Sequence, residues 1–425
     1  MDAKIVNRDG DNVSIQIDVS LKGSMLDAED RIQSALNKAG TLATEELLSK
    51  FDSDGSPITF GSVKYTARSR DAKTYQTPYG EIALERYVYQ TSKGGKIFVP
   101  LETDARIIGT STPRFAKIVS NKYANMGSTA LIKDLNENHN RRVVRSFVKN
   151  VSDRVGAIAL AKEEQWTYSM PEMEKPIKTV TIGLDGTTLR MDDGKYRESM
   201  VGTIGLYDKS GERQHTIYIG ATPEYGKEKF INRLELEIKH VKDLYPKSEY
   251  VGLADGARDN WPFLEKHTTH QIIDFYHATE YVHDAADTKF KKKIQQSEKN
   301  IWLDDRMHKL KHNMGGASRM LREFQEWKVD VKDDNGLIKA AITYFTNNKK
   351  RMKYYKYLDM NMPIGSGVTE AACKVIIKQR MCLSGMRWKE EGAAKVISLR
   401  CLTKSTDRWE QFWGKIDQYG YQLAA

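Results

Sequence analysis

The sequence has few cysteines and no long run of apolar residues. Its 425 residues include three cysteines, Cys373, Cys382 and Cys401, and none stands in a CxxC or His/Cys spacing typical of zinc sites. We therefore expect reduced thiols and no zinc centre. No window reaches the roughly 20 apolar residues of a membrane helix, and residues 1–16 lack the order of a secretory signal. These absences predict a cytoplasmic protein.

Internal repeats and low-complexity tracts are also absent, and the length predicts two or three domains. Lys and Arg outnumber Asp and Glu by 67 to 57, which gives a formal net charge of +10. This excess favours a polyanionic partner such as nucleic acid. Many basic proteins bind no nucleic acid, so the charge alone leaves the partner open.

Residues 1–110 form a mixed N-terminal region. A helix is predicted over 28–51, because five apolar residues recur there at helical spacing: Ile32, Leu36, Leu47, Leu48 and Phe51. Residues 75–102 alternate apolar and polar side chains around glycine-containing turns, which predicts a small antiparallel ribbon.

Residues 111–170 change to helical periodicity. Thr112 and Pro113 predict a helix start, Ser128 a second, and residues 141–155 a third helix whose apolar stripe is Val144, Phe147, Val148, Val151 and Val155. The opposite side of the third helix would carry four cations: Arg141, Arg142, Arg145 and Lys149. Three short helices with a basic last one are typical of a helix-turn-helix module that reads DNA. The alternative is a helical bundle with an ordinary solvated face.

A linker is expected at 170–178, followed by an α/β region. Residues 178–277 read as three hairpin-linked strands, a helix, a strand, a short helix and a last strand, which predicts one mixed sheet between helices. Residues 278–361 read as almost wholly helical, with no strand. The C-terminal part, 362–415, reads as two helices that break at Ser384 and Gly385.

Three acidic residues are placed at the ends of predicted elements. Asp185 ends the first strand of the sheet, Asp255 ends the fourth, and Glu370 opens a helix. Because the first and fourth strands are usually neighbours, we expect both aspartates to emerge side by side, where they would repel unless a cation lies between them. Oxygen ligands of this kind suit Mg²⁺. Two such ions support in-line displacement at phosphorus.

The alternative to a metal site is that each acid is only a turn or cap residue, since a DG pair after a strand is a common turn. Asp192 and Asp193 are assigned to such a turn, in a predicted hairpin. Only the combination of three acids at suitable positions favours a metal site.

Several blocks of the sequence resemble one family. These are "GLDGTTLRM", "GLADGARDNW", "IIDFYHATEYV", "YFTNNKKRMKY", "PIGSGVTEAACKVIIKQR", "SGMRWKEEGAAKVISLR" and "DRWEQFW", in this order between about residues 178 and 415. They resemble the signature blocks of the ISKra-type insertion-sequence transposases, relatives of the Mutator-like group. Many relatives carry a cysteine-bearing ribbon before this region, whereas residues 85–104 here contain no cysteine.

The resemblance implies a ribonuclease H-like catalytic domain formed by 178–277 and 362–415, with 278–361 as a helical insertion. Its acidic triad would be Asp185, Asp255 and Glu370, holding Mg²⁺ or Mn²⁺. Asp274 and His277 match an Asp-x-x-His element that the wider superfamily places on the strand after the second acid, with a role in local hydrogen bonding or DNA contact. A purely structural His277 is the alternative.

Side chains near the third acid are candidates for DNA contact. Trp388 would stack on a base if it is not simply part of the core. Lys374, Lys378 and Arg387 are phosphate-contact candidates, because Glu370 would lie beside anionic substrate if it binds metal.

The expected function is therefore DNA transposition in a bacterial cytoplasm, close to the nucleoid. The protein would bind terminal inverted repeats and target DNA as a homodimer or larger assembly, and it would cleave and join strands. Two alternatives remain open: a transposase-derived DNA-binding protein without catalysis, and a metal-dependent nuclease that does not join strands.

Overall fold

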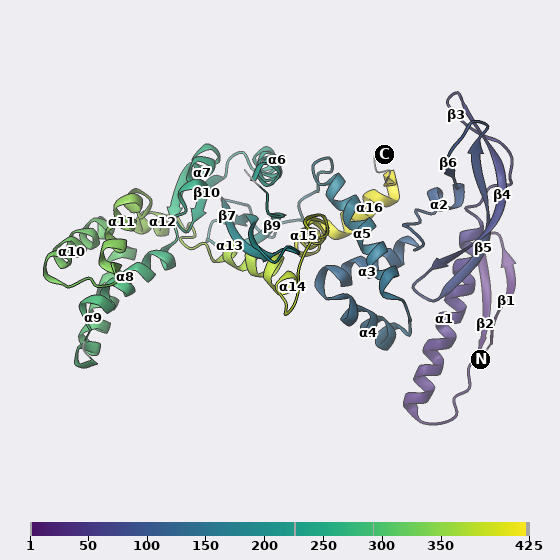
Figure 1. The fold of residues 1–425 in the computed structure, drawn as a ribbon, viewed down its shortest axis with the longest axis horizontal. Coiled ribbons are helices and arrows are strands. Elements are labelled where there is room, and N and C mark those ends of the chain that lie inside the picture. Colours follow the sequence, from purple (N-terminus) through teal and green to yellow (C-terminus); the bar gives the residue numbers. More distant parts are fainter. Residues whose placement is uncertain (1, 225–226, 292, 422–425) are drawn as a thin grey trace. The chain divides into compact units, whose positions relative to one another are not determined.

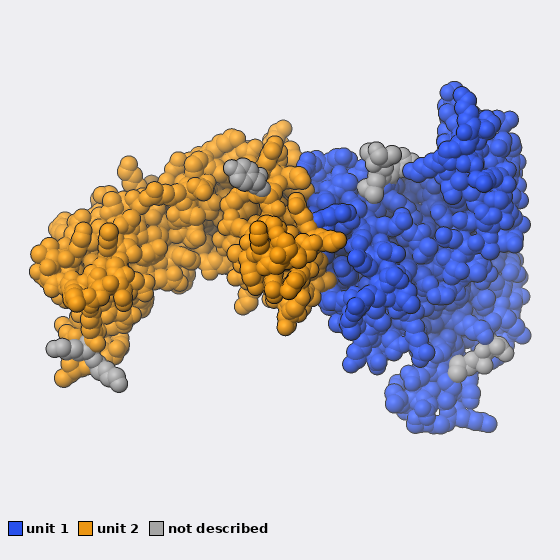
Figure 2. All heavy atoms as spheres, in the orientation of Figure 1, with its two compact units in different colours: residues 1–168, 391–403, 408–425 blue, residues 169–390, 404–407 orange. Residues whose placement is uncertain are grey.

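The computed structural model describes residues 2–224, 227–291 and 293–421 (Figure 1). The chain divides into two compact units (Figure 2). Unit 1 contains the chain up to Tyr168, residues 391–403 and the chain from Arg408 onward, and unit 2 contains 169–390 and 404–407. The sequence analysis grouped 362–415 with the sheet. Most of α15 (Glu390–Lys404) and all of α16 (Arg408–Tyr419) instead belong to unit 1.

Unit 1 begins with a hairpin that the sequence analysis missed. Its strands are β1 (Asp2–Asp9) and β2 (Asn12–Asp18), and α1 (Met25–Ser49) follows. The predicted helix is thus present, but four of the five predicted stripe residues are largely exposed: Ile32, Leu36, Leu47 and Phe51. The buried residues are Ala28, Ala35 and Leu48, because α1 turns its small side chains toward the rest of the unit.

The predicted ribbon is a four-stranded antiparallel sheet in the order β3-β4-β5-β6. Its bounds are Ile58–Phe60, Val63–Gln76, Glu81–Thr91 and Gly94–Phe98, with α2 at Pro100–Asp104. A small apolar core that includes Leu48, Tyr75 and Val88 stabilises it.

Three helices follow, as predicted: α3 (Pro113–Asn125), α4 (Ser128–His139) and α5 (Arg145–Lys162). The predicted start of the third helix at 141 is wrong. Val144 is its N-cap and is 66 % exposed, whereas Val148, Val151 and Val155 are buried as expected. The three helices share their core with Leu399, Phe412 and Trp413 of the C-terminal helices.

Unit 2 is built on a five-stranded mixed sheet in the order β11-β10-β7-β8-β9. The strands are β7 (Thr179–Arg190), β8 (Tyr196–Tyr207), β9 (Arg213–Ala221), β10 (Glu249–Ala254) and β11 (His270–Ile273). β7, β8 and β9 form an antiparallel meander, and β10 lies parallel to both β7 and β11. The predicted mixed sheet is confirmed, as is the pairing of its first and fourth strands.

Helices cover both faces of this sheet. α6 (Glu228–Leu244) buries an apolar stripe at helical spacing: Phe230, Leu234, Ile238 and Val241. Leu234 lies over Gly202 of β8, while Thr369 of α13 (Gly367–Ala372) lies over Gly183 of β7. Gly183 pairs with Thr203, the neighbour of Gly202, and neighbouring strand residues face opposite sides. α6 and α13 therefore cover opposite faces.

Between β11 and α13 the regular elements of the described residues are all helices, joined by short turns and loops, as predicted for 278–361. Its α-helices are α8 (Phe275–Lys289), α9 (Gln296–His312), α10 (Gly316–Asp330), α11 (Leu337–Asn348) and α12 (Tyr354–Asp359). α7 (Trp261–His267) lies before β11. After α13, a π-helical turn (Cys373–Lys378) and α14 (Gln379–Met381) precede a break that includes Ser384 and Gly385. The second predicted C-terminal helix is in fact two, since α15 and α16 are separated at Ser405–Asp407.

Candidate active site

The site lies where the pairing between two parallel strands stops. β10 pairs with β7 from Glu249 opposite Thr179 to Leu253 opposite Gly183, and Asp255 and Asp185 each stand two residues further on. β7 itself continues to Arg190, paired only with β8 on its other side. Asp185 is therefore inside its strand, which corrects the prediction that it ends the strand. The two carboxylates nevertheless follow equivalent positions of adjacent strands.

Glu370 enters from the helix above this edge. α13 approaches β7 so closely that a Cβ at Gly183 would lie 2.1 Å from Thr369 Oγ1. Thr369 also shares a 2.7 Å hydrogen bond with Thr203 of β8. This contact fixes the first turn of α13, which contains Glu370 as predicted.

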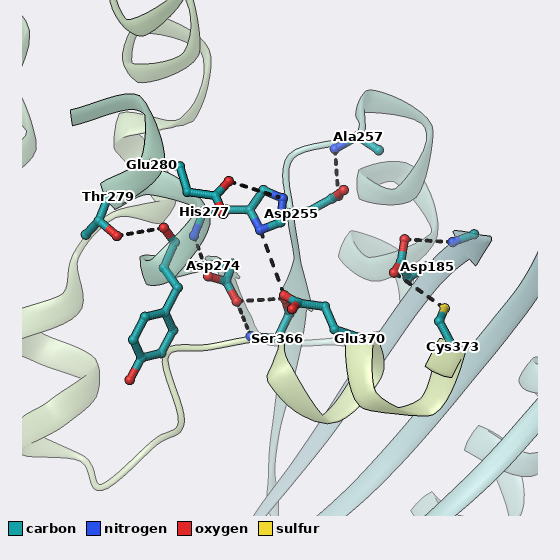
Figure 3. A network of polar contacts seen from close by, with 12 residues as sticks. Asp185, Asp255, Ala257, Asp274, His277, Thr279, Glu280, Ser366, Glu370 and Cys373 are labelled. Atoms are coloured by element: carbon teal, nitrogen blue, oxygen red, sulfur yellow. Dashed lines mark hydrogen bonds and ion pairs between the residues drawn. The ribbon is translucent and has the colours of Figure 1, made fainter. Parts of the chain in front are cut away.

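The three acids line one small cavity of about 30 Å³. Its other lining residues are Leu184, Leu253, Ala254, His277, Ser366 and Thr369. Figure 3 shows Asp185, Asp255 and Glu370 arriving on separate elements. The sequence prediction that these three residues converge is consistent with this arrangement.

The carboxylate of Asp185 is held by short-range contacts. Its Oδ1 accepts a 2.7 Å hydrogen bond from the Gly186 amide, and its Oδ2 accepts one from Cys373 Sγ at 3.4 Å. Burial raises the pKa of Asp185, and the negative charges of Asp255 and Glu370 raise it further. Burial, together with the Asp185 charge, also raises the pKa of the Cys373 thiol, so this cysteine stays a neutral donor.

Asp255 is held through its backbone as well as its side chain. Its Oδ1 accepts a 3.1 Å hydrogen bond from the Ala257 amide, and its carbonyl accepts a 2.8 Å bond from the Tyr344 hydroxyl. Tyr344 belongs to α11, so the helical segment positions the second acid directly. Its ring stacks on Tyr281 with centroids 4.0 Å apart.

A fourth carboxylate, Asp274, is completely buried beside the third acid. The sequence analysis placed Asp274 and His277 on a strand, but Asp274 is the N-cap of α8 and its Oδ1 accepts a 2.8 Å bond from the His277 amide. Its Oδ2 accepts hydrogen bonds from the amide of Ser366 and, at 2.6 Å, from the Ser366 hydroxyl. Asp274 thus joins the start of α8 to the segment that leads into α13.

Ser366 also lies 2.9 Å from Glu370 Oε1 through its hydroxyl oxygen. A hydroxyl has one proton and can donate it to only one of two carboxylates. With both acids ionised, the second contact therefore needs a proton or a cation. His277 Nδ1 is 3.8 Å from Glu370 Oε1, and its Nε2 is 4.0 Å from Glu280 Oε2 (Figure 3).

Among the described residues, the group whose potential metal-ligating atoms all lie within 4.8 Å is Asp274, His277 and Glu370. Asp185 and Asp255 do not belong to a group with that spacing in the described part of the chain. The predicted triad therefore shares a cavity, while Glu370 is also drawn toward Asp274 and His277. Sequence reasoning missed Ser366, Cys373 and Tyr344, and only the position of Ser366 four residues before Glu370 gave a local signal.

The predicted DNA-contact residues divide into two groups. Arg141 is 6 % exposed, and its guanidinium donates to the Thr77 carbonyl and Gln76 Oε1, so its predicted surface position is wrong. The other cations are exposed: Arg142, Arg145, Lys149, Lys374, Lys378 and Arg387. Arg142 and Arg145 contact neutral side chains, Asn136 and Thr129.

Trp388 has a structural role in unit 2. Its indole Nε1 donates to the Met381 carbonyl at 2.9 Å, and its backbone pairs with Arg190 and Asp192 beyond the end of β7. Arg380 lies over its ring at 5.4 Å. These contacts attach the segment after α14 to the sheet. Asp192 and Asp193 lie in the β7–β8 turn, as predicted.

A larger cavity of about 730 Å³ is lined by Gly256, the residue that follows Asp255. It is also lined by residues of α7 and α11, and by three cations, Arg258, Lys339 and Arg351. Arg351 stacks 4.1 Å over the Trp261 ring and pairs with Glu265 at 2.7 Å. The larger cavity therefore has basic and aromatic lining residues, and Gly256 in its lining is the sequence neighbour of Asp255 in the acidic site.

Comparisons of the chain with protein-family models and with curated protein sequences found no match. Among the described residues, no helix has both the length and the apolar character needed to cross a membrane.

Proposed function

We propose that the protein is a DNA transposase that cleaves and joins DNA strands with divalent cations held by Asp185, Asp255 and Glu370. The observation that carries the proposal is their common cavity, reached from aligned positions of two parallel strands and from the first turn of α13. The sheet order and the helical segment before Glu370 are compatible with the ribonuclease H-like domain implied by the resemblance.

The donor set fits Mg²⁺ or Mn²⁺. Carboxylate oxygens are hard ligands, and the mutual repulsion that raises the pKa of Asp185 would be relieved by a cation. The contact between Ser366 and two carboxylates also needs a positive charge or a proton nearby. When bound, such ions stabilise the attacking and leaving oxygens of phosphoryl transfer.

The residues of the chain would orient this reaction. Asp185 and Asp255 are fixed by backbone amides, and Glu370 is placed by the first turn of α13, with its Oε1 2.9 Å from the Ser366 hydroxyl. In the first step water attacks the phosphodiester at the DNA end and releases a 3′ hydroxyl. In the second step that hydroxyl, losing its proton, attacks a phosphodiester of target DNA, and the P–O bond to the target strand's 3′ oxygen breaks and releases a 3′ hydroxyl of the target. The exposed cations Lys374, Lys378 and Arg387 are proposed to contact backbone phosphates close to Glu370.

A joining assay tests this function and separates it from both alternatives. Labelled duplexes made from the DNA that flanks the reading frame would be incubated with the protein, Mg²⁺ and a target plasmid. The proposal predicts nicked ends and joined products with wild-type protein, and intact DNA that is still bound with Asp185→Asn. Binding without nicking by wild-type protein would support a non-catalytic DNA-binding protein, and nicking without joining would support a nuclease.

A further inference from the structure

The four-stranded sheet of unit 1 ends in a surface that combines exposed apolar side chains with lysines. Two short turns lie at this end, because Phe60 pairs with Val63 across the first and Thr91 with Gly94 across the second. We call this surface the ribbon tip. It consists of Phe60, Val63, Lys64, Lys93, Lys96 and Ile97. In Figure 1 the end of the sheet that carries β3 stands away from α3 and α4 of the same unit.

The apolar residues of the ribbon tip are exposed although they carry large side chains. Phe60 is 53 % exposed, Val63 44 % and Ile97 49 %. Phe60 is nevertheless oriented, because its ring packs edge-on against Tyr65 and Phe98 with centroids 5.9 and 5.2 Å away. Exposed apolar groups rimmed by polar residues mark interaction surfaces. The ring is thus held in place with one side available to a partner.

The charge around the ribbon tip is of one sign. Residues 55–69 contain Lys64 and Arg68, residues 87–101 contain Lys93 and Lys96, and neither segment contains an acidic residue. Among the described residues, the ammonium groups of Lys64, Lys93 and Lys96 make no ion pair. A surface with fixed positive charge and no internal counterion is complementary to a polyanion.

We propose that the ribbon tip binds duplex DNA, with its lysines on backbone phosphates and Phe60 and Ile97 inserted as an apolar wedge at a base step. Proteins that bind the minor groove in this way place apolar wedges between base pairs and thereby bend the duplex. The proposal rests on the proposed function only in taking DNA as the polyanion. It adds that unit 1 deforms the DNA in addition to contacting it.

Two matched variants of the full chain test whether the lysines of the ribbon tip contact DNA phosphates. Lys93→Glu/Lys96→Glu changes the ribbon tip, and Lys4→Glu/Lys22→Glu makes the same charge change at exposed lysines elsewhere in unit 1. Binding of a labelled duplex would be measured by fluorescence anisotropy over a series of salt concentrations. The slope of log affinity against log salt should fall by about 2 for the ribbon variant, since each phosphate contact contributes about 0.9. Equal slopes for the two variants would overturn the proposal.

The wedge is tested by Phe60→Ser/Ile97→Ser. This variant should leave the slope of log affinity against log salt unchanged and weaken DNA binding about tenfold, as expected for the loss of one base–aromatic contact. It should also abolish DNA bending, which is measured by energy transfer between the duplex ends. An unchanged unfolding midpoint shows that the fold is intact. Unchanged bending would overturn the proposal by showing that no wedge enters the DNA. A loss of binding to phosphatidylglycerol vesicles with DNA binding unaffected would overturn it by showing that the ribbon tip binds a membrane surface. Loss of the proposed catalysis is a separate result, because it is read from cleavage and not from binding.

Discussion

At the scale of single residues, the site is defined by how four buried or half-buried carboxylates are neutralised. Asp274 is buried but accepts hydrogen bonds from two amides and a hydroxyl, so its charge is stabilised by the protein itself. Asp185 accepts only one amide and a weak thiol donor. The difference indicates that Asp274 is a positioning residue, whereas Asp185 has capacity left for a cation.

The raised pKa of Asp185 gives a pH-dependent prediction. Because burial favours its neutral form, this group stabilises the fold fully below the unfolded pKa of about 3.9, and the contribution is lost as pH rises through the higher folded pKa. Without metal, Asp185→Asn should therefore be more stable than wild type at pH about 7, with a smaller difference at pH about 4. Urea unfolding in EDTA measures this. A difference that does not change with pH would contradict it, and added Mg²⁺ should narrow the gap at pH about 7.

Asp274→Ala should destabilise the protein by about 2–4 kcal/mol. The variant loses a helix N-cap, worth about 1 kcal/mol, and leaves the amide of Ser366 buried without its acceptor. Chemical denaturation measures the change, and Asp193→Ala in the exposed β7–β8 turn is the control. We expect cleavage at low temperature to fall as well, because Asp274 would no longer hold the segment that leads into α13 and Glu370. A loss of stability no larger than that of the control would refute this role.

At the scale of elements, the position of Glu370 depends on the close approach of α13 to β7. A Cβ at Gly183 would overlap Thr369 Oγ1, so Gly183→Ala should displace α13, cost about 1–3 kcal/mol and reduce Mg²⁺-dependent cleavage. The matched control is Gly392→Ala in α15, where a Cβ meets nothing within 4 Å and should stabilise the helix slightly. Denaturation midpoints and nicking rates measure both effects. Equal denaturation midpoints and nicking rates for the two variants would show that α13 does not pack tightly on β7.

The sequence predicted elements best where the burial pattern is strong. The first six residues of β7 are all buried, and α6 buries the four residues of its stripe, so both elements were recognised. The β1–β2 hairpin was missed because only one of its faces is half-buried and its turn is highly charged. The stripe of α1 was misassigned because this helix buries alanines, which carry little hydrophobic signal.

The candidate site was predicted only in part, because only some of its residues lie beside elements with a strong burial pattern. Asp185 and Asp255 come directly after the apolar parts of adjacent strands and Glu370 opens a helix, so their approach could be inferred from the strand order. The contributions of Tyr344 and Cys373 depend on how separate elements pack, and no local pattern encodes that. Arg141 was misplaced because the helix starts four residues later than its periodicity suggested.

At the scale of the whole molecule, the net charge of +10 is relevant to binding only where the cations are exposed. Arg145→Ala should weaken DNA binding for all sequences and lower the salt slope by about 0.9, because Arg145 is exposed on α5. Arg141→Ala should instead lower thermal stability and leave the slope of the folded protein unchanged, since Arg141 is buried against Thr77 and Gln76. Anisotropy titrations at several salt concentrations compare the two, and a changed slope for Arg141→Ala would contradict its structural role.

The central claim is that β7, β10 and α13 bring three carboxylates to shared divalent cations. Anomalous diffraction from crystals grown with Mn²⁺ and a DNA duplex tests it most directly. The account predicts a peak within about 2.0–2.2 Å of carboxylate oxygens of Asp185 and Asp255, with Glu370 completing the site directly or at a second ion. A peak held only by Asp274, His277 and Glu370, with Asp185 and Asp255 free of metal, would contradict it.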